Sequence, residues 1–289
     1  MIHKVGKFNF IVGLLILLVI VCAFGVKGQI GVVAFVLLKL YFPLIGIPLM
    51  MVLVVWFIIR KIRRKEVMHQ LGGIGVCAMM SFMIFTNIGI VDIVYPAKTK
   101  ALTSVTVQWP FKEATIVGWG GNTVAENYHA AYPNIRYAYD LVMTPHDIES
   151  RNNADYGIWE KVIYSPVKGK VIATYNEEED IAAGTEDFKS QLGNYVFIQI
   201  EETGTYLVMG HMKQGSIRVK EGDSVEAGDL LGQVGNSGTS SEPHLHIHHQ
   251  KQNPTKVLTF AEGLPLYFKD INAAAMPVKG IEVVPTKIK

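Results

Sequence analysis

Cysteine is almost absent from this sequence, since its 289 residues include only Cys22 and Cys77. Both cysteines lie in long apolar runs, so the polar part of the chain after residue 95 has none. Disulfides therefore play no part there, and a structural zinc site built from thiolates is excluded as well. A metal site in that part would have to use histidine and carboxylate ligands.

A strong excess of charge of one sign is also missing. The chain has 27 lysines and arginines against 25 aspartates and glutamates, which gives a formal net charge of +2. Nucleic-acid-binding domains usually carry a clear basic surface. We find neither a glycine-rich phosphate loop nor a basic-aromatic pattern typical of RNA binding. We therefore expect no nucleic-acid partner.

Long apolar runs are present, and they are confined to the first 95 residues. Hydrophobic residues make up 49% of the chain, and the runs cover residues 8–26, 33–59 and 72–95. Each run is long enough to cross a hydrocarbon core, which takes about 20 helical residues. This pattern predicts that residues 1–95 form an anchor of three transmembrane helices in the lipid bilayer.

Basic residues predict how this anchor is oriented. A dense basic cluster at residues 60–65 and the lysines ahead of the first run both belong in the cytoplasm by the positive-inside rule. Within the middle run, Pro43 and Pro48 mark either a kink in one helix or a break between two half-spans. An even number of crossings must separate the two basic segments, so the runs before residue 60 count as two spans. The third span then predicts a multi-pass protein of the cell membrane whose remaining domain is extracytoplasmic.

The sequence after residue 95 changes character. Residues 96–106 are polar and weakly patterned and are expected to be a linker, whereas residues 253–289 are expected to be a C-terminal extension. Between them, short β-prone runs are separated by glycine, asparagine, proline and acidic turns; they are residues 161–164, 170–175, 195–200 and 206–209. This pattern predicts a mainly antiparallel β domain over residues 107–252.

Histidine is concentrated at one point of this domain. Four of the nine histidines lie within residues 244–249. Because side chains alternate along an extended segment, His244, His246 and His248 share one face and His249 points the other way. Neutral imidazole is both a metal ligand and a general base near neutral pH. The run is internal and interrupted by apolar residues, so it predicts a functional site and not a tag.

Several segments together resemble one known family. They are residues 162–171, 193–196, 210–212, 219–235 and 235–246, the last of which reads GNSGTSSEPHLH. In this order they resemble the M23 peptidases, the LytM/lysostaphin-like zinc endopeptidases that cut peptide cross-links in bacterial peptidoglycan. The resemblance covers roughly residues 107–252. It implies a β domain of the LytM/barrel-sandwich type, a Zn²⁺ cofactor and peptidoglycan peptides as substrate.

The resemblance implies roles for five residues. His246 ends the family's His-x-His motif and would bind zinc, and His244 begins it and would be catalytic. The upstream His211 would be the second catalytic histidine. His129 and Asp140 are the candidates for the two remaining zinc ligands. The roles of His211 and His244 are not distinguished from each other.

The sequence departs from the family pattern at two points. The family commonly has its first histidine and aspartate ligands four residues apart, whereas His129 and Asp140 are eleven apart, so a longer loop must bring them together. His146 and Asp147 compete with them, although Thr-Pro-His-Asp reads as an ordinary turn. His248 stands where the family usually has an acid, and is expected to lie behind the ligands or on the surface.

These residues favour a zinc metalloendopeptidase that hydrolyses peptides with activated water, but other functions are open. A catalytically silent LytM-like domain could act as a scaffold or as an activator of other cell-wall hydrolases. Residues 219–225 also resemble part of a biotinyl or lipoyl carrier domain, in which Lys213 of Met212-Lys213 would be the carrier lysine. However, the second methionine expected after that lysine is absent. A zinc peptidase with a soluble or protein substrate is a further alternative, because loops such as residues 176–191 set specificity. All five site positions are filled, which favours an enzyme.

Overall fold

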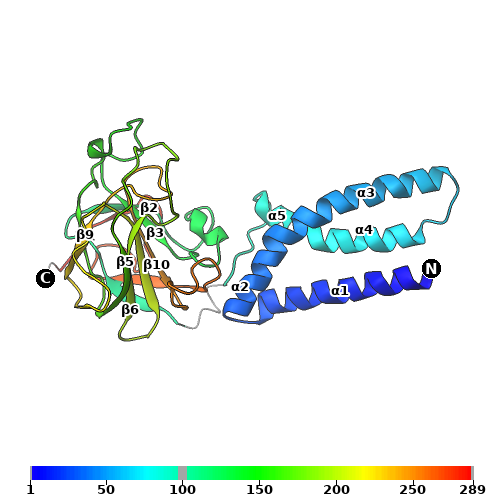
Figure 1. Cartoon of the computed structure of the whole chain (residues 1–289), viewed down its shortest axis with the longest axis horizontal. Coiled ribbons are helices and arrows are strands. Elements are labelled where there is room, and N and C mark those ends of the chain that lie inside the picture. The colour runs from blue at the N-terminus through cyan, green and yellow to red at the C-terminus, as the bar shows by residue number, and fades with distance from the viewer. Residues whose placement is uncertain (1, 97–102, 288–289) are drawn as a thin grey trace. The chain divides into compact units, whose positions relative to one another are not determined.

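The computed structural model describes residues 2–96 and 103–287 of the chain (Figure 1). It divides into two compact units, Met1–Tyr95 and Pro96–Lys289. The first unit is helical and the second consists mainly of β-strands.

The first unit contains five α-helices and one π-helical turn. They are α1 (Ile2–Gly25), α2 (Gln29–Val36), the π turn (Leu37–Tyr41), α3 (Phe42–Ile62), α4 (Met68–Ser81) and α5 (Ile84–Asn87). Helix α3 packs against α4, and α1 packs against α2 and α4 (Figure 1). Three helical stretches are long and apolar enough to cross a membrane, namely Lys7–Gly25, Gln29–Ile62 and Gln70–Asn87. The third ends eight residues before the predicted boundary at residue 95.

The middle stretch, Gln29–Ile62, runs on through both prolines as 34 continuous helical residues. Pro43 has no N–H and so cannot donate to the carbonyl of Lys39, four residues earlier. The Asn87 side-chain amide donates to that carbonyl instead, at 2.7 Å. A partner from another helix is the usual way in which a proline is accommodated in an apolar helix. This part of the chain is therefore one helix with a compensated irregularity and not two half-spans.

The second unit confirms the predicted fold, a mainly antiparallel β domain. Its strands are β1 (Val105–Gln108), β2 (Thr115–Trp119), β3 (Tyr139–Val142), β4 (Val162–Tyr164), β5 (Gly169–Tyr175), β6 (Asn194–Ile200), β7 (Tyr206–Met212), β8 (Ser224–Val225), β9 (Leu230–Gln233), β10 (Leu245–Gln250), β11 (Gly263–Leu264), β12 (Leu266–Lys269) and β13 (Glu282–Val283). Nine of them form one sheet in the order β13-β2-β3-β10-β7-β6-β5-β8, with β11 on β10. Strands β4 and β9 pair separately, and β1 and β12 form a parallel pair.

The middle of the large sheet brings the predicted site together. Strand β10 lies between β3 and β7, and His246 is directly opposite Asp140 on one side and Gly210 on the other. Leu245 and Ile247 are fully buried in the hydrophobic core. Directly opposite residues of paired strands project from the same face. Alternation along β10 therefore places His246 beside Asp140 on the face away from Leu245 and Ile247.

The predicted C-terminal extension contributes strands that pair with strands of this domain. Strand β12 pairs with β1, and β13 pairs with β2 at the edge of the large sheet. Phe268 of β12 is buried against Trp109, with ring centroids 4.6 Å apart. The predicted linker also ends earlier than expected, since Val105 and Thr106 already belong to β1, while residues 97–102 lie outside the described part of the chain.

Candidate metal centre and active site

Three of the predicted site residues, His129, Asp140 and His246, form a compact buried group. One potential ligand atom from each lies within 4.8 Å of the others. His129 Nε2 is 3.3 Å from Asp140 Oδ2, and His246 Nδ1 is 2.9 Å from Asp140 Oδ1. All three residues are at most 5% exposed. The structure thus places two imidazole nitrogens on either side of one carboxylate.

Asn127 closes the eleven-residue gap between His129 and Asp140. It caps the short 3₁₀ helix Tyr128–Ala131, because its side chain accepts a hydrogen bond from the backbone N–H of His129. Its amide nitrogen donates to the carbonyls of Gly121 and Ala138 at 3.1 and 2.9 Å. Ala138 immediately precedes β3, so Asn127 ties the His129 helix to the strand that carries Asp140. Our sequence reasoning missed Asn127, although asparagine is a preferred residue at a helix N-cap.

The same asparagine fixes the tautomer of His129. Because both carbonyls require the amide nitrogen, the Asn127 oxygen must face His129, and it lies 2.8 Å from Nδ1. An amide oxygen only accepts, so His129 Nδ1 carries the hydrogen and Nε2 carries the lone pair. That lone pair faces the Asp140 carboxylate, which is repulsive unless a cation lies between them. The donor set, two imidazoles and a carboxylate, fits a catalytic zinc ion.

The pKa shifts at this group agree with that donor set. Burial is the largest effect at His129 and lowers its pKa to about 4, although the Asp140 charge opposes the shift. Burial alone would raise the pKa of Asp140, but His129, His244 and His246 together hold it below its usual range. Neutral imidazole and ionised carboxylate are the forms that bind metals.

His211 and His244, the two predicted catalytic residues, lie next to this group. Their ring centroids are 4.6 Å apart, and His244 Nε2 is 3.7 Å from Asp140 Oδ1. His211 Nδ1 donates to the Ser237 carbonyl at 2.8 Å, and His244 Nδ1 donates to the Glu242 carbonyl at the same distance. In the neutral form each ring therefore keeps its Nε2 lone pair free to accept a proton.

The environment of His211 is unusual in two further respects. Burial, reinforced by His244 and His246, lowers its pKa well below the usual histidine value. Its backbone has a φ of 60°, a conformation that costs about 1–3 kcal/mol for a residue other than glycine and clusters at functional sites. Its N–H and carbonyl are both used, by Leu192 and Gly235 respectively. These two backbone hydrogen bonds keep His211 in its strained conformation.

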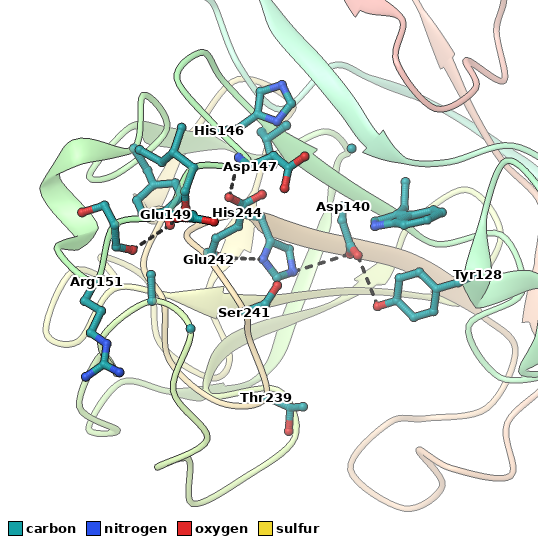
Figure 2. A pocket seen from close by; sticks show the side chains of 18 of the residues that line it. Tyr128, Asp140, His146, Asp147, Glu149, Arg151, Thr239, Ser241, Glu242 and His244 are labelled. Atoms are coloured by element: carbon teal, nitrogen blue, oxygen red, sulfur yellow. Dashed lines mark hydrogen bonds and ion pairs between the residues drawn. The ribbon is translucent and has the colours of Figure 1, made fainter.

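An open cleft of about 720 Å³ adjoins the site, and Asp140 and His244 form part of its wall. Figure 2 shows His244 between Glu242 and Asp140, with Tyr128 on the other side of Asp140. The Tyr128 hydroxyl donates to Asp140 Oδ2 at 3.3 Å. His146, the competing ligand candidate, lies on the cleft wall and is not part of the three-residue group.

Part of the β unit matches a known protein family. Residues 154–257 match peptidase family M23. This segment of the β unit is therefore similar to M23 peptidases. The matched segment includes His211, His244 and His246, whereas His129 and Asp140 lie ahead of it.

Individual relatives are similar over shorter stretches. An "Uncharacterized metalloprotease" of Buchnera aphidicola subsp. Baizongia pistaciae (strain Bp) is 38% identical over 76 residues, which is 25% of this chain and 19% of the relative. The chain thus spans about a fifth of the length of that relative. Among solved structures, lysostaphin from Staphylococcus simulans is 22% identical and covers 53% of this chain and 52% of its own, with a TM-score of 0.31. LytU is 27% identical over 36% of this chain and 62% of its own, with a TM-score of 0.28.

Two further histidines of β10 are buried in the β unit. His248 is 1% exposed and lies behind His246, with its Nδ1 2.9 Å from His246 Nε2, so the surface alternative is wrong. His249, for which the sequence suggested no role, is equally buried. It joins β10 to Thr205 Oγ1 at 2.6 Å and to the Pro265 carbonyl at 3.1 Å. Burial lowers the pKa of His249 to about 4, which keeps this structural ring neutral.

Proposed function

We propose that this protein is a membrane-anchored zinc metalloendopeptidase that hydrolyses peptide bonds in the stem or cross-bridge peptides of peptidoglycan. One observation carries the proposal. Beside a buried His-Asp-His donor set, two further imidazoles donate from Nδ1 to backbone carbonyls, which leaves Nε2 as the accepting nitrogen of each neutral ring, and the cleft reaches both Asp140 of this donor set and His244. The M23 match supports a peptidase, and the resemblance of the sequence to that family supports peptidoglycan as substrate.

His129, Asp140 and His246 would hold the zinc ion. When bound there, zinc supplies a Lewis acid that polarises a peptide carbonyl and makes water a stronger nucleophile at neutral pH. His211 and His244 can each accept a proton at Nε2 from an attacking water. The imidazolium formed in this way can donate that proton to the departing amine. Tyr128 steadies Asp140 by its hydrogen bond to Oδ2.

The cleft walls suggest how a peptide is bound. Trp119 and Tyr128 stack edge to face with ring centroids 5.2 Å apart, and Lys279 lies over the Trp119 ring. Asp147 and Glu242 lie on the cleft wall near His244, where the backbone N–H of Asp147 donates to the Glu242 carboxylate at 2.7 Å. This aromatic wall has a positive charge at Lys279 and negative charges at Asp147 and Glu242 nearby. It therefore suits a polar peptide with amino and carboxylate groups.

The activity can be tested with the full chain in detergent micelles and purified peptidoglycan. We expect zinc-loaded protein to release free amino groups and soluble muropeptides, and a chelator to stop the release until zinc is restored. Free amines and muropeptides are measured over time for both samples. If zinc-loaded protein releases no amines from peptidoglycans of several cross-link types, the catalytically silent scaffold becomes the better explanation.

The membrane orientation gives a separate prediction. We propose that the N-terminus and residues 60–65 are cytoplasmic and that the M23 domain is extracytoplasmic, because the basic cluster follows the second of three apolar helices. Green fluorescent protein fused after Lys65 should fluoresce, whereas alkaline phosphatase should be active only when fused after Ser104. Reporters that locate both junctions on one side would contradict three crossings.

A further inference from the structure

The geometry points to His248 as a positioning residue for the metal site, a role that rests on the proposed function. We infer that His248, together with Gln250, fixes the tautomer of His246 so that Nδ1 is the atom offered to the metal. The evidence is a directed chain of hydrogen bonds along β10. Each link has its donor and acceptor determined by the link before it.

The series of hydrogen bonds starts at Gln250, which is fully buried. Its amide nitrogen donates to the carbonyls of Gln252 and Val257 at 2.6 and 3.0 Å. Because carbonyls only accept, this orientation of the amide is required, and its oxygen must point the other way. The Gln250 oxygen lies 3.1 Å from His248 Nε2, so it accepts a hydrogen bond and Nε2 carries the hydrogen.

The position of the hydrogen on His248 in turn determines which nitrogen of His246 carries a hydrogen. Within the described residues, the side-chain hydrogen bonds of His248 are to His246 and Gln250, and a buried ring without a carboxylate partner is stable only when neutral. Neutral His248 with a hydrogen on Nε2 has a lone pair on Nδ1, which accepts from His246 Nε2–H at 2.9 Å. The hydrogen of neutral His246 is thereby used, and its Nδ1 lone pair faces Asp140 Oδ1 at 2.9 Å.

The two histidine ligands are thus controlled in the same way from opposite sides. The hydrogen of His129 is fixed directly by Asn127, and that of His246 is fixed by Gln250 through His248. In both cases an amide whose hydrogens are taken by two backbone carbonyls sets the direction. Outer partners that hold the far nitrogen of a metal-binding histidine orient the ring and tune its basicity. His248 extends that principle by one additional imidazole.

The test measures zinc affinity and not hydrolysis. His248→Phe keeps an aromatic ring but removes the acceptor, and we expect the dissociation constant for zinc of the full chain in micelles to rise by about 10–100-fold. His248→Asn places an oxygen near the position of Nδ1 and should recover most of that loss. Gln250→Leu should cause a smaller loss than His248→Phe, because it acts through His248. Competition with a chromophoric chelator measures the constants, and the visible spectrum of bound Co²⁺ reports the ligand field.

A matched control is available one residue away. His249→Phe alters an equally buried histidine of the same strand that faces Thr205 and Pro265, so it should lower thermal stability and leave zinc affinity unchanged. Wild-type zinc affinity in His248→Phe, or no recovery in a folded His248→Asn, would overturn the inference. Should His248→Phe fail to fold, the comparison of His248→Asn with Gln250→Leu decides in the same way. A wild type that binds no zinc would instead overturn the proposed function.

Discussion

Replacing Asp140 is expected to remove zinc binding and peptidoglycan hydrolysis together. This carboxylate contacts both His129 and His246, and it supplies the negative charge of the donor set. Without it, two neutral imidazoles remain, a weak set for a divalent cation. The loss of zinc affinity should exceed the factor of about 10–100 that is typical of changes outside the ligands. Zinc content of the purified full chain, measured by atomic absorption, tests this directly.

The choice of substitution separates metal loss from unfolding. In Asp140→Asn the single amide nitrogen can donate to the lone pair of either His129 Nε2 or His246 Nδ1, and the side chain keeps the volume of Asp140, so we expect a folded protein without zinc. Asp140→Ala removes this contact and leaves a cavity. His129→Ala and His246→Ala should also lose zinc, whereas His146→Ala should retain it, because His146 lies on the cleft wall. Full zinc occupancy in all three ligand variants would contradict the assignment.

A mixed result would be informative as well. Zinc loss in the Asp140 and His246 variants but not in His129→Ala would mean that another histidine, His146 or His248, supplies the third ligand. The structure argues against this outcome because the Asn127 amide already directs the His129 Nε2 lone pair toward Asp140.

The sequence predicted those features that depend on local pattern. Apolar run length predicted the helical first unit, and β-prone runs separated by turn residues predicted most of the central strands. Alternation within residues 244–249 predicted that His246 and His248 share one face. The helix ends were less well predicted, because the apolar character of residues 88–95 continues beyond the point where the helix stops at Asn87.

Features that depend on long-range pairing could not be derived in this way. That His246 lies opposite Asp140 depends on which strands are neighbours, and a single sequence does not specify this. Strands β12 and β13 are only four and two residues long, too short for a clear periodicity, yet they complete the domain. The burial of His248 has the same origin, since alternation assigns a residue to a face but does not show what covers that face.

Asn127 and Gln250 were missed for a related reason. Each is an uncharged amide whose importance comes from two backbone carbonyls, at Gly121 and Ala138 for one and at Gln252 and Val257 for the other. Such carbonyls are present at every residue and leave no trace in a sequence. Only the folded chain shows that both amides determine which nitrogen a nearby histidine offers.

The second large effect is expected at the two histidines outside the donor set. His244→Ala should leave zinc bound and the fold intact while reducing the rate of peptidoglycan hydrolysis by a factor of about 10²–10³. The reason is that His244 Nε2 lies 3.7 Å from Asp140 Oδ1, too far for a hydrogen bond, while its Nδ1 hydrogen is donated to the Glu242 carbonyl. Rates of amine release and zinc content are measured on the same preparations.

For His211 the conservative choice is asparagine, because the backbone φ of 60° is tolerated by asparagine better than by alanine. His211→Asn should therefore fold and retain zinc, and should lose activity to a similar extent as His244→Ala. His146→Ala serves as the control on the cleft wall and should keep both zinc and most of the activity. A catalytically silent scaffold predicts a different pattern, in which partner binding survives both substitutions and the wild type has no turnover to lose. Undiminished hydrolysis in His244→Ala, with zinc still bound, would show that the proton passes through another group.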